Sequence, residues 1–279
     1  MKLPPAAVQV ARIAWRHGRA VAGERIVPEE TPVALTYNRA TYAVMLASPA
    51  DLEDFAIGFS QSEGVIARPA EIQELTILPV EHGIEARMWL SPERAQAIQA
   101  RRRHLTGATG CGLCGMESLA EATRNPPKVT AIARFTPEEV AAAIAALPAA
   151  QALNRQTHAV HAAALWTPQA GLIALREDVG RHNALDKLAG ALARQGVSAA
   201  GGILLLSSRV SIELIQKAAI IGAGMMAAIS SPTALAVRQA EAAGITLIGV
   251  ARDDGFEVFT HPTRVTPNRV DEETARHVA

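Results

Sequence analysis

From Pro137 onward the chain alternates alanine-rich helical segments with short apolar strands, and this alternation constrains the fold more than any other feature. Strands joined by single helices usually pair in parallel within one sheet. The pattern therefore predicts an α/β layered domain with a largely parallel sheet. The predicted helices span 137–147, 180–195, 210–224 and 232–243, and the predicted strands lie near 159–166, 171–177, 203–207, 226–230, 245–251 and 256–260.

The preceding part of the chain is richer in strands and predicts a smaller β-rich α+β module. Two strand pairs are expected at 33–37 with 41–47 and at 72–79 with 83–90. A helix through about Ser62 is expected after a capping pattern that starts at Ser48. A further helix is expected from Glu93 to about His104. We therefore divide the chain into an N-terminal lead-in (1–23), a β-rich module (24–122) and an α/β domain (123–279).

The composition is that of a globular protein and excludes several classes of function. Of 279 residues, 49% are hydrophobic, and 27 basic side chains balance 27 acidic ones. A protein that coats nucleic acid or a membrane surface needs a basic excess, so neither partner is expected. No secretory signal is expected because Arg12 and Arg16 interrupt the apolar residues near the N-terminus. The longest uncharged run contains Pro232 and two glycines, so it predicts no membrane span, and we expect a cytoplasmic protein.

The only two cysteines are Cys111 and Cys114, three positions apart in a glycine-rich segment. Glycines leave the backbone bare, so a ligand or partner can approach the sulfur atoms closely. The basic run 101–104 lies just upstream, and nearby positive charge lowers the pKa of a thiol and favours the nucleophilic thiolate. The pair therefore indicates a reactive site in a reducing compartment.

Other interpretations of the cysteine pair fit less well. A structural zinc site needs four ligands, usually from two such pairs, and there is only one. A zinc deaminase would show a His-x-Glu motif followed by Pro-Cys-x-x-Cys, and neither is present. A thioredoxin-like protein would carry the pair after an early strand of a βαβ unit. Two inert, buried cysteines would need no glycine-lined loop, so we expect no metal and a chemical role.

The richest polar stretch, Glu177–Lys187, follows an apolar strand and opens a helix. In α/β sheets this is where phosphates and other ligands tend to bind. Arg181 and Lys187 are candidates to hold phosphate oxygens. His182 and Asp186 stand four residues apart on one helix face, and an aspartate can accept hydrogen bonds from a guanine edge. A capped, solvated first turn with ordinary ion pairs is the structural alternative.

Two later segments also place cations and hydroxyls after strands. Ser208 and Arg209 follow the strand near 203–207. If all these strands end at one edge of a parallel sheet, the segments should converge there with Arg181 and Lys187 to hold an anionic nucleotide. The structural alternative is that Arg264, which follows the last strand, is an ordinary surface residue. The segment after the last strand consists of Phe259, Thr260, His261, Pro262, Thr263 and Arg264.

Taken in order, these motifs resemble the formate dehydrogenase accessory sulfurtransferases, the FdhD family. The likeness covers nearly the whole chain, and the cysteine motif together with the long polar motif is highly specific. The motifs are Gly110–Gly115, His161–Ala164, Glu177–Lys187 and Arg209–Ser211.

The resemblance implies a cytidine-deaminase-like α/β domain without deaminase chemistry, a smaller module and a homodimer. It implies that a cysteine desulfurase passes sulfane sulfur to Cys111, assisted by Cys114. The sulfur then goes to the molybdenum (or tungsten) bis(molybdopterin guanine dinucleotide) cofactor of the formate dehydrogenase catalytic subunit. The resemblance places this cofactor at Phe259–Arg264, with GDP as a surrogate ligand. The alternative is a chaperone that only binds the cofactor and uses the cysteines for docking or redox sensing.

Overall fold

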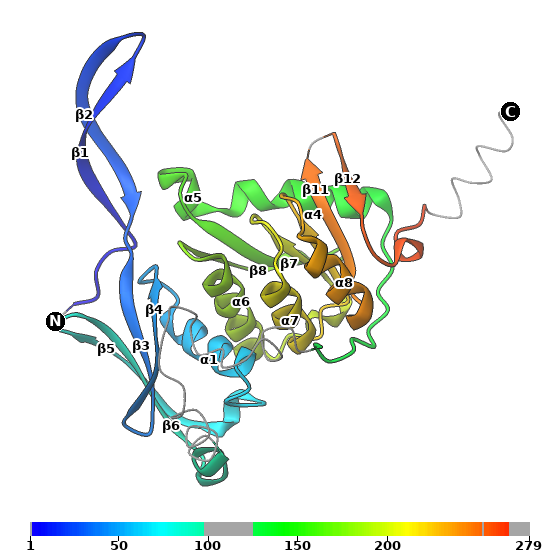
Figure 1. Cartoon of the computed structure of the whole chain (residues 1–279), viewed down its shortest axis with the longest axis horizontal. Helices are drawn as coiled ribbons and strands as arrows, with labels where there is room; N and C mark the ends of the chain where they lie inside the picture. The colour runs from blue at the N-terminus through cyan, green and yellow to red at the C-terminus, as the bar shows by residue number, and fades with distance from the viewer. Residues whose placement is uncertain (1, 98–124, 253, 268–279) are drawn as a thin grey trace, which may run out of the picture. The chain divides into compact units, whose positions relative to one another are not determined.

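A computed structural model describes residues 2–97, 125–252 and 254–267 (Figure 1). The chain falls into two compact units. The first comprises residues 1–124, 151–161 and 176–195, and the second comprises residues 125–150, 162–175 and 196–279. Within the described ranges, no helix combines the length and apolar character needed to cross a bilayer.

The first unit contains a four-stranded sheet in the order β4-β3-β6-β5. Strands β3 (Thr31–Tyr37) and β4 (Ala40–Ala47) form a hairpin, and β5 (Ile72–Val80) and β6 (Gly83–Leu90) form a second one. Strands β3 and β6 join the two hairpins in parallel. The predicted strand pairs are therefore confirmed.

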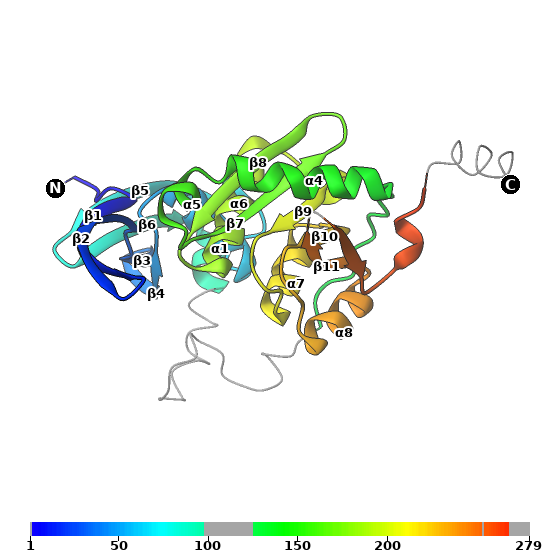
Figure 2. The ribbon, with the colours of Figure 1, turned by 90° about the horizontal axis from the view of Figure 1, so that it is seen from above.

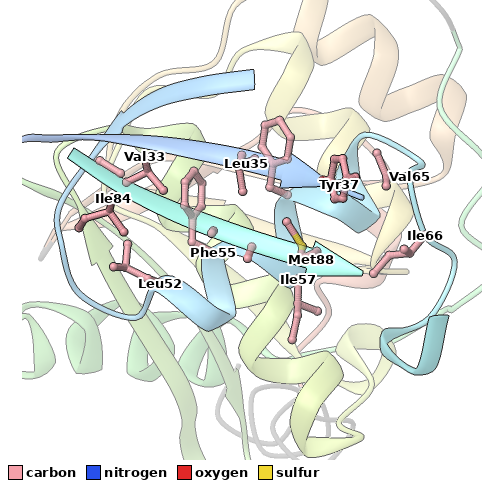
Figure 3. Close-up of a cluster of buried hydrophobic side chains, with 14 of the residues drawn as sticks. Val33, Leu35, Tyr37, Leu52, Phe55, Ile57, Val65, Ile66, Ile84 and Met88 are labelled. Atoms are coloured by element: carbon pink, nitrogen blue, oxygen red, sulfur yellow. The ribbon is translucent and has the colours of Figure 1, made fainter. Parts of the chain in front are cut away.

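One face of this sheet packs against helix α1 (Leu52–Ser62) to form the core of the first unit (Figure 3). Strand β6 alternates buried and half-buried residues along its length, as expected when one face is covered. The labelled side chains of this core are Val33, Leu35, Tyr37, Leu52, Phe55, Ile57, Val65, Ile66, Ile84 and Met88.

The prediction of a lead-in over residues 1–23 needs correction, because the structure forms a long hairpin from residue 7 to residue 28. Strands β1 (Ala7–Arg16) and β2 (Arg19–Pro28) pair antiparallel over their full lengths. The turn residues His17 and Gly18 both have positive φ, of 50° and 72°. Two such residues make the tight turn whose twist matches that of paired strands.

The second unit is built on a six-stranded sheet in the order β12-β11-β10-β9-β7-β8, and the predicted α/β class is confirmed. The central strands β9 (Ile203–Leu206), β10 (Met225–Ala228) and β11 (Thr246–Arg252) are parallel and almost wholly buried. Helices α7 (Ile212–Ile220) and α8 (Ala234–Ala243) make the crossovers between them.

The outer strands depart from the parallel pattern. Strand β7 (His161–Thr167) pairs antiparallel with β9, and β12 (Gly255–Val258) pairs antiparallel with β11. Strand β8 (Gly171–Asp178) lies beside β7. The sheet is therefore mixed, with a parallel centre. The likeness of this domain to cytidine deaminases stays a prediction.

Helices cover both faces of this sheet. Ile203 and Leu205 of β9 belong to a cluster with helix α4 (Pro137–Ala150), so Leu204 and Leu206 point to the opposite face. Figure 2 shows α4 on one side of the sheet and α7 and α8 on the other. The result is a three-layered α/β arrangement.

The predicted boundary near residue 123 needs correction, because the first unit recruits two later segments. These are residues 151–161, with helix α5 (Ala152–Thr157), and residues 176–195, with helix α6 (Arg181–Gln195). Helix α6 packs on α1 through two glycines. A Cβ atom at Gly58 would lie 1.7 Å from the Asp186 carbonyl oxygen, and one at Gly190 would lie 1.9 Å from the Asp54 carbonyl oxygen. Only glycine permits this backbone approach.

Candidate functional site

The cysteine pair, Cys111 and Cys114, lies outside the described residues. The structure places the remaining candidate residues, which are divided between the two units. Arg181, His182, Asp186 and Lys187 belong to the first unit. Ser208, Arg209 and the segment Phe259–Arg264 belong to the second.

The polar stretch 177–187 spans the end of β8 and the start of α6, and Asp178 is its centre. The Asp178 carboxylate is fully buried and accepts hydrogen bonds from the backbone N–H of Ser48 (2.9 Å) and that of Gly180 (2.7 Å). It also accepts a bond from the Asn183 side-chain amide at 3.0 Å. Several donors around one buried carboxylate offset the cost of removing its charge from water.

Lys187 supplies the positive charge for Asp178. Both side chains have no exposed surface, and Lys187 Nζ lies 2.6 Å from Asp178 Oδ2. The same ammonium donates to the Ser48 carbonyl oxygen at 2.9 Å. The pair thereby ties the loop between β4 and α1 to helix α6. Burial and these partners favour a structural role for Lys187 over direct contact with a phosphate.

Asp186 also points into the interior of the first unit. It is 1% exposed, and its Oδ1 accepts a hydrogen bond from the Ser62 hydroxyl at 2.6 Å. A second acidic anchor, Asp54 of α1, receives hydrogen bonds from Arg176 and Arg194, both at 2.8 Å. The contact between α1 and α6 is thus flanked by buried carboxylates with cationic or hydroxyl partners.

Glu177 has a capping role that the sequence analysis did not assign. Its two carboxylate oxygens accept hydrogen bonds from the backbone N–H groups of Leu153 and Asn154, at 2.7 and 2.8 Å. These are among the first N–H groups of α5, which have no partner within the helix. Glu177 therefore fixes α5 to the end of β8.

Arg181, beside His161, carries a buried donor, its Nε, for which no hydrogen-bond partner is found among the described residues. Burial and the positive charge of Arg181 lower the pKa of His161, although Asp178 opposes this shift. The His161 imidazole is therefore neutral near pH 7. Of the first-unit candidates, Arg181 best keeps a donor available for an anion, and His182 lies beside it, half-buried.

In the second unit, Ser208 and Arg209 follow β9 at the carboxyl end of the parallel strands. Ser208 is 3% exposed, and its hydroxyl donates to the Arg209 carbonyl oxygen at 3.2 Å. The Arg209 side chain is exposed. Arg209 can therefore reach a ligand, whereas Ser208 shapes the turn that presents it.

The segment Phe259–Arg264 lies at the amino ends of the parallel strands, opposite to Ser208 and Arg209. Arg264 donates to the carbonyl oxygens of Gly244 (2.6 Å) and Gly224 (3.4 Å), the residues shortly before β11 and β10 begin. The Thr260 hydroxyl accepts from the Leu247 N–H and donates to the Ile245 carbonyl oxygen. The expected convergence of this segment with Ser208 and Arg209 is therefore wrong. The reason is that β12 runs antiparallel and returns the chain to the amino ends of the parallel strands.

The rest of this segment is partly open. His261 adopts a left-handed conformation, with φ of 47°, and its Nε2 lies 3.2 Å from the Glu241 carbonyl oxygen. Pro262 and Thr263 are exposed and, with Arg264, form a short 3₁₀ helix. The Phe259 ring lies against Gly249, where an added Cβ atom would be 3.0 Å from the ring. Pro262 and Thr263 are therefore the residues of this segment that a ligand could contact.

Comparison with known proteins decides the family. The model of the FdhD/NarQ family matches residues 28–266. The chain belongs to this family. A sulfur carrier protein FdhD from Agrobacterium fabrum is 50% identical over 258 residues, covering 92% of this chain and 95% of that protein. A sulfur carrier protein FdhD from Cupriavidus necator is 49% identical over 263 residues, covering 94% and 91%.

A solved structure supports the fold of this FdhD/NarQ family member. It is the crystal structure of a candidate formate dehydrogenase accessory protein from Desulfotalea psychrophila. The TM-score is 0.71 at 25% identity, and the match covers 94% of this chain and 100% of that one. The resemblance deduced from the sequence motifs is thus confirmed.

Sequence reasoning missed the positioning residues Ser48, Asp54 and Arg176. The partners of Ser48 lie 130 and 139 residues further along the chain. Asp178 was visible as part of the polar stretch, but no local signal indicates that it is buried. Such long-range pairs become visible only once α6 is known to pack on α1.

We expect Lys187→Met to destabilise the protein by about 3–5 kcal/mol, because it leaves the buried Asp178 charge without its cation. Urea unfolding followed by circular dichroism measures the change. Lys128→Met is the matched control. Lys128 is exposed, so its replacement should change the free energy of unfolding by no more than about 0.5 kcal/mol. Equal effects of the two variants would contradict a structural role for Lys187.

Proposed function

We propose that this protein is a sulfur carrier that serves the maturation of formate dehydrogenase. The observation that carries the proposal is the name shared by relatives at about 50% identity, sulfur carrier protein FdhD, over more than 90% of the chain. The cysteine motif supports it, since Cys111 and Cys114 are the only thiols in the sequence.

The chemistry requires a thiolate that accepts and releases one sulfur atom. The Cys111 thiolate attacks the outer sulfur of a persulfide on a cysteine desulfurase. A new S–S bond forms on Cys111, and the desulfurase thiolate leaves. Release of the outer sulfur as sulfide requires two electrons. The Cys114 thiolate supplies them by attacking the Cys111 sulfur and forming a disulfide, which a cellular thiol reductant reopens.

The acceptor in this proposal is the molybdenum bis(molybdopterin guanine dinucleotide) cofactor, before its insertion into the formate dehydrogenase catalytic subunit. This cargo presents phosphates and guanine edges. Arg181 and Arg209 are cations at candidate binding positions, and His261 to Thr263 offer partly exposed backbone. The two ends of the parallel strands support separate contacts to such an extended molecule. We further propose a homodimer that works in the cytoplasm.

Cys111→Ala should abolish persulfide formation and client maturation while leaving the fold intact, because it removes the accepting thiolate. Intact-mass analysis after incubation with a desulfurase and cysteine should show one reducible added sulfur on the unaltered protein and none on the variant. Formate dehydrogenase activity in cells reports maturation. A protein that binds GDP but never gains sulfur would instead be a cofactor-binding chaperone.

We expect no stoichiometric zinc on the cysteine pair, because two thiolates supply only half of a tetrahedral structural site. Elemental analysis of protein purified without chelator measures the metal content. Cys114→Ser is the matched variant. About one zinc per chain that is lost in this variant would overturn the thiol-transfer interpretation in favour of a metal site.

Arg181→Ala and Arg264→Ala should each weaken GDP binding, at separate sites, by about ten- to a hundredfold, the loss expected when one phosphate contact is removed. Isothermal titration measures the dissociation constants. Arg238→Ala, at an exposed position of α8, is the control and should bind normally. Thermal melts must accompany Arg264→Ala, because Arg264 also bonds the Gly244 carbonyl oxygen. Unchanged binding in both variants would remove these residues from the candidate binding sites.

A further inference from the structure

The β1–β2 hairpin has two chemically different faces. Residues that pair across the strands share a face, so Ile13 with Ala22 and Trp15 with Ala20 make one apolar side near the turn. The opposite side carries arginines. On that side, Arg16 pairs with Arg19 next to the turn. Arg12 pairs with Gly23, and Arg25 pairs with Val10 nearer the root of the hairpin.

The apolar face of this hairpin is exposed in the described structure. Ile13 is 67% exposed, and Trp15 is 74% exposed. A two-stranded hairpin alone is at best marginally stable in water. The contacts that anchor it lie near its root, where Glu29 N–H bonds the Ala6 carbonyl oxygen and Arg25 bonds the Thr157 carbonyl oxygen. Figure 1 shows the hairpin running beyond the end of the four-stranded sheet of the same unit. The hairpin therefore needs a further surface.

A second exposed apolar surface lies on the same unit. The outer face of the four-stranded sheet is the side that does not face α1. It carries Val44 (58% exposed), Leu46 (54%) and Val80 (41%). The register places Leu46 opposite Pro32 and Val44 opposite Ala34 on that face. Clustered apolar side chains on an open sheet face mark an interaction site.

The charges of the two surfaces are complementary. Residues 1–28 hold five basic side chains and one acidic side chain, a formal charge of +4. Residues 29–97, which form the four-stranded sheet and α1, hold four basic and eleven acidic side chains, a formal charge of −7. Opposite fields attract the hairpin of one molecule to the sheet module of another.

The chain connection favours a second copy over the chain's own sheet. Strand β2 ends at Pro28 and β3 begins at Thr31, so only Glu29 and Glu30 connect them. The bond from Glu29 N–H to Ala6 closes the root of the hairpin. Folding the hairpin back over the outer face would require a reversal within these two residues. A second copy meets no such restriction.

We propose that the β1–β2 hairpin of one copy packs its apolar face on the outer face of the four-stranded sheet of a second copy, and that the exchange is reciprocal. Each copy gives one hairpin and one sheet face, so the contact closes as a dimer with two equivalent interfaces. Sulfur transfer plays no part in this contact. The test below can therefore fail while the sulfur-carrier proposal stands, and the reverse also holds.

The experiment compares molar masses by light scattering and sedimentation over a range of protein concentrations. The hairpin variant is Ile13→Glu with Trp15→Glu, and the sheet variant is Val44→Glu with Leu46→Glu. Each should raise the dimer dissociation constant by at least about tenfold, because it places charge in an apolar contact. Ile132→Glu is the control. Ile132 is 66% exposed, like Ile13, but lies in the second unit, so this variant should stay dimeric.

Mixing the two variants distinguishes hairpin exchange from other contacts. The hairpin variant keeps an unaltered sheet, and the sheet variant keeps an unaltered hairpin. Their mixture should therefore form a heterodimer through one intact interface, although each variant alone is monomeric. Differently tagged chains and native mass spectrometry detect it.

Three results would overturn the proposal: an unaltered protein that is monomeric throughout, a hairpin variant that keeps the dimer mass, or monomeric variants that form no heterodimer. The last result would mean that the dimer is not held by a hairpin on a sheet face, whereas hairpins that pack on each other would leave the sheet variant dimeric. Unchanged dimer masses in both variants would mean that the dimer forms through another surface. Because all four altered side chains are exposed or near the surface, circular dichroism should show intact folds. High salt should also weaken the unaltered dimer.

Discussion

The first unit depends on one buried ion pair, Asp178 with Lys187. A buried charge destabilises a fold unless it is paired and hydrogen-bonded, and this pair meets both conditions through Ser48, Gly180 and Asn183. Its partners come from the β4–α1 loop, the end of β8 and helix α6. The polar stretch Glu177–Lys187 was predicted to be a ligand site. Two of its side chains, Asp178 and Lys187, instead hold α6 to the N-terminal module. In this stretch, Arg181 is left for a ligand, beside the structural pair.

In the second unit, the candidate residues lie at the two opposite ends of the parallel strands. Ser208 and Arg209 lie at the carboxyl ends of the parallel strands, whereas Arg264 lies at their amino ends. A four-residue strand spans about 13 Å, so the two ends are separate surfaces. An extended dinucleotide cofactor with two guanine ends suits such an arrangement better than a small ligand does. The antiparallel direction of β12 decides this placement.

Much of the fold was predictable because the relevant signals are local. The alternation after Pro137 predicted the strands and all the helices but the short α5 to within a few residues, and the gap between the strands predicted at 33–37 and 41–47 marked the β3–β4 turn. The contacts of Ser48 and Asp178 are 130 residues apart in sequence and leave no local trace. The direction of β12 had a local signal that was overlooked, since Asp254-Gly255 between two apolar strands is typical of a hairpin. The β1–β2 hairpin was missed because its strands, in which most residues are exposed, do not alternate cleanly between apolar and polar residues along their length. The candidate site was found as residue types, but its geometry was not.

The discontinuous first unit has a consequence for synthesis on the ribosome. Helix α1 emerges early, but its partner α6 is complete only after residue 195. Until then, the glycine-lined face of α1 and the carboxylate of Asp54 have no helix to receive them. The N-terminal module therefore stays partly assembled while residues 125–150 and 162–175 of the other unit are translated. The glycine-rich cysteine segment is translated during that interval, before α6 can pack on α1.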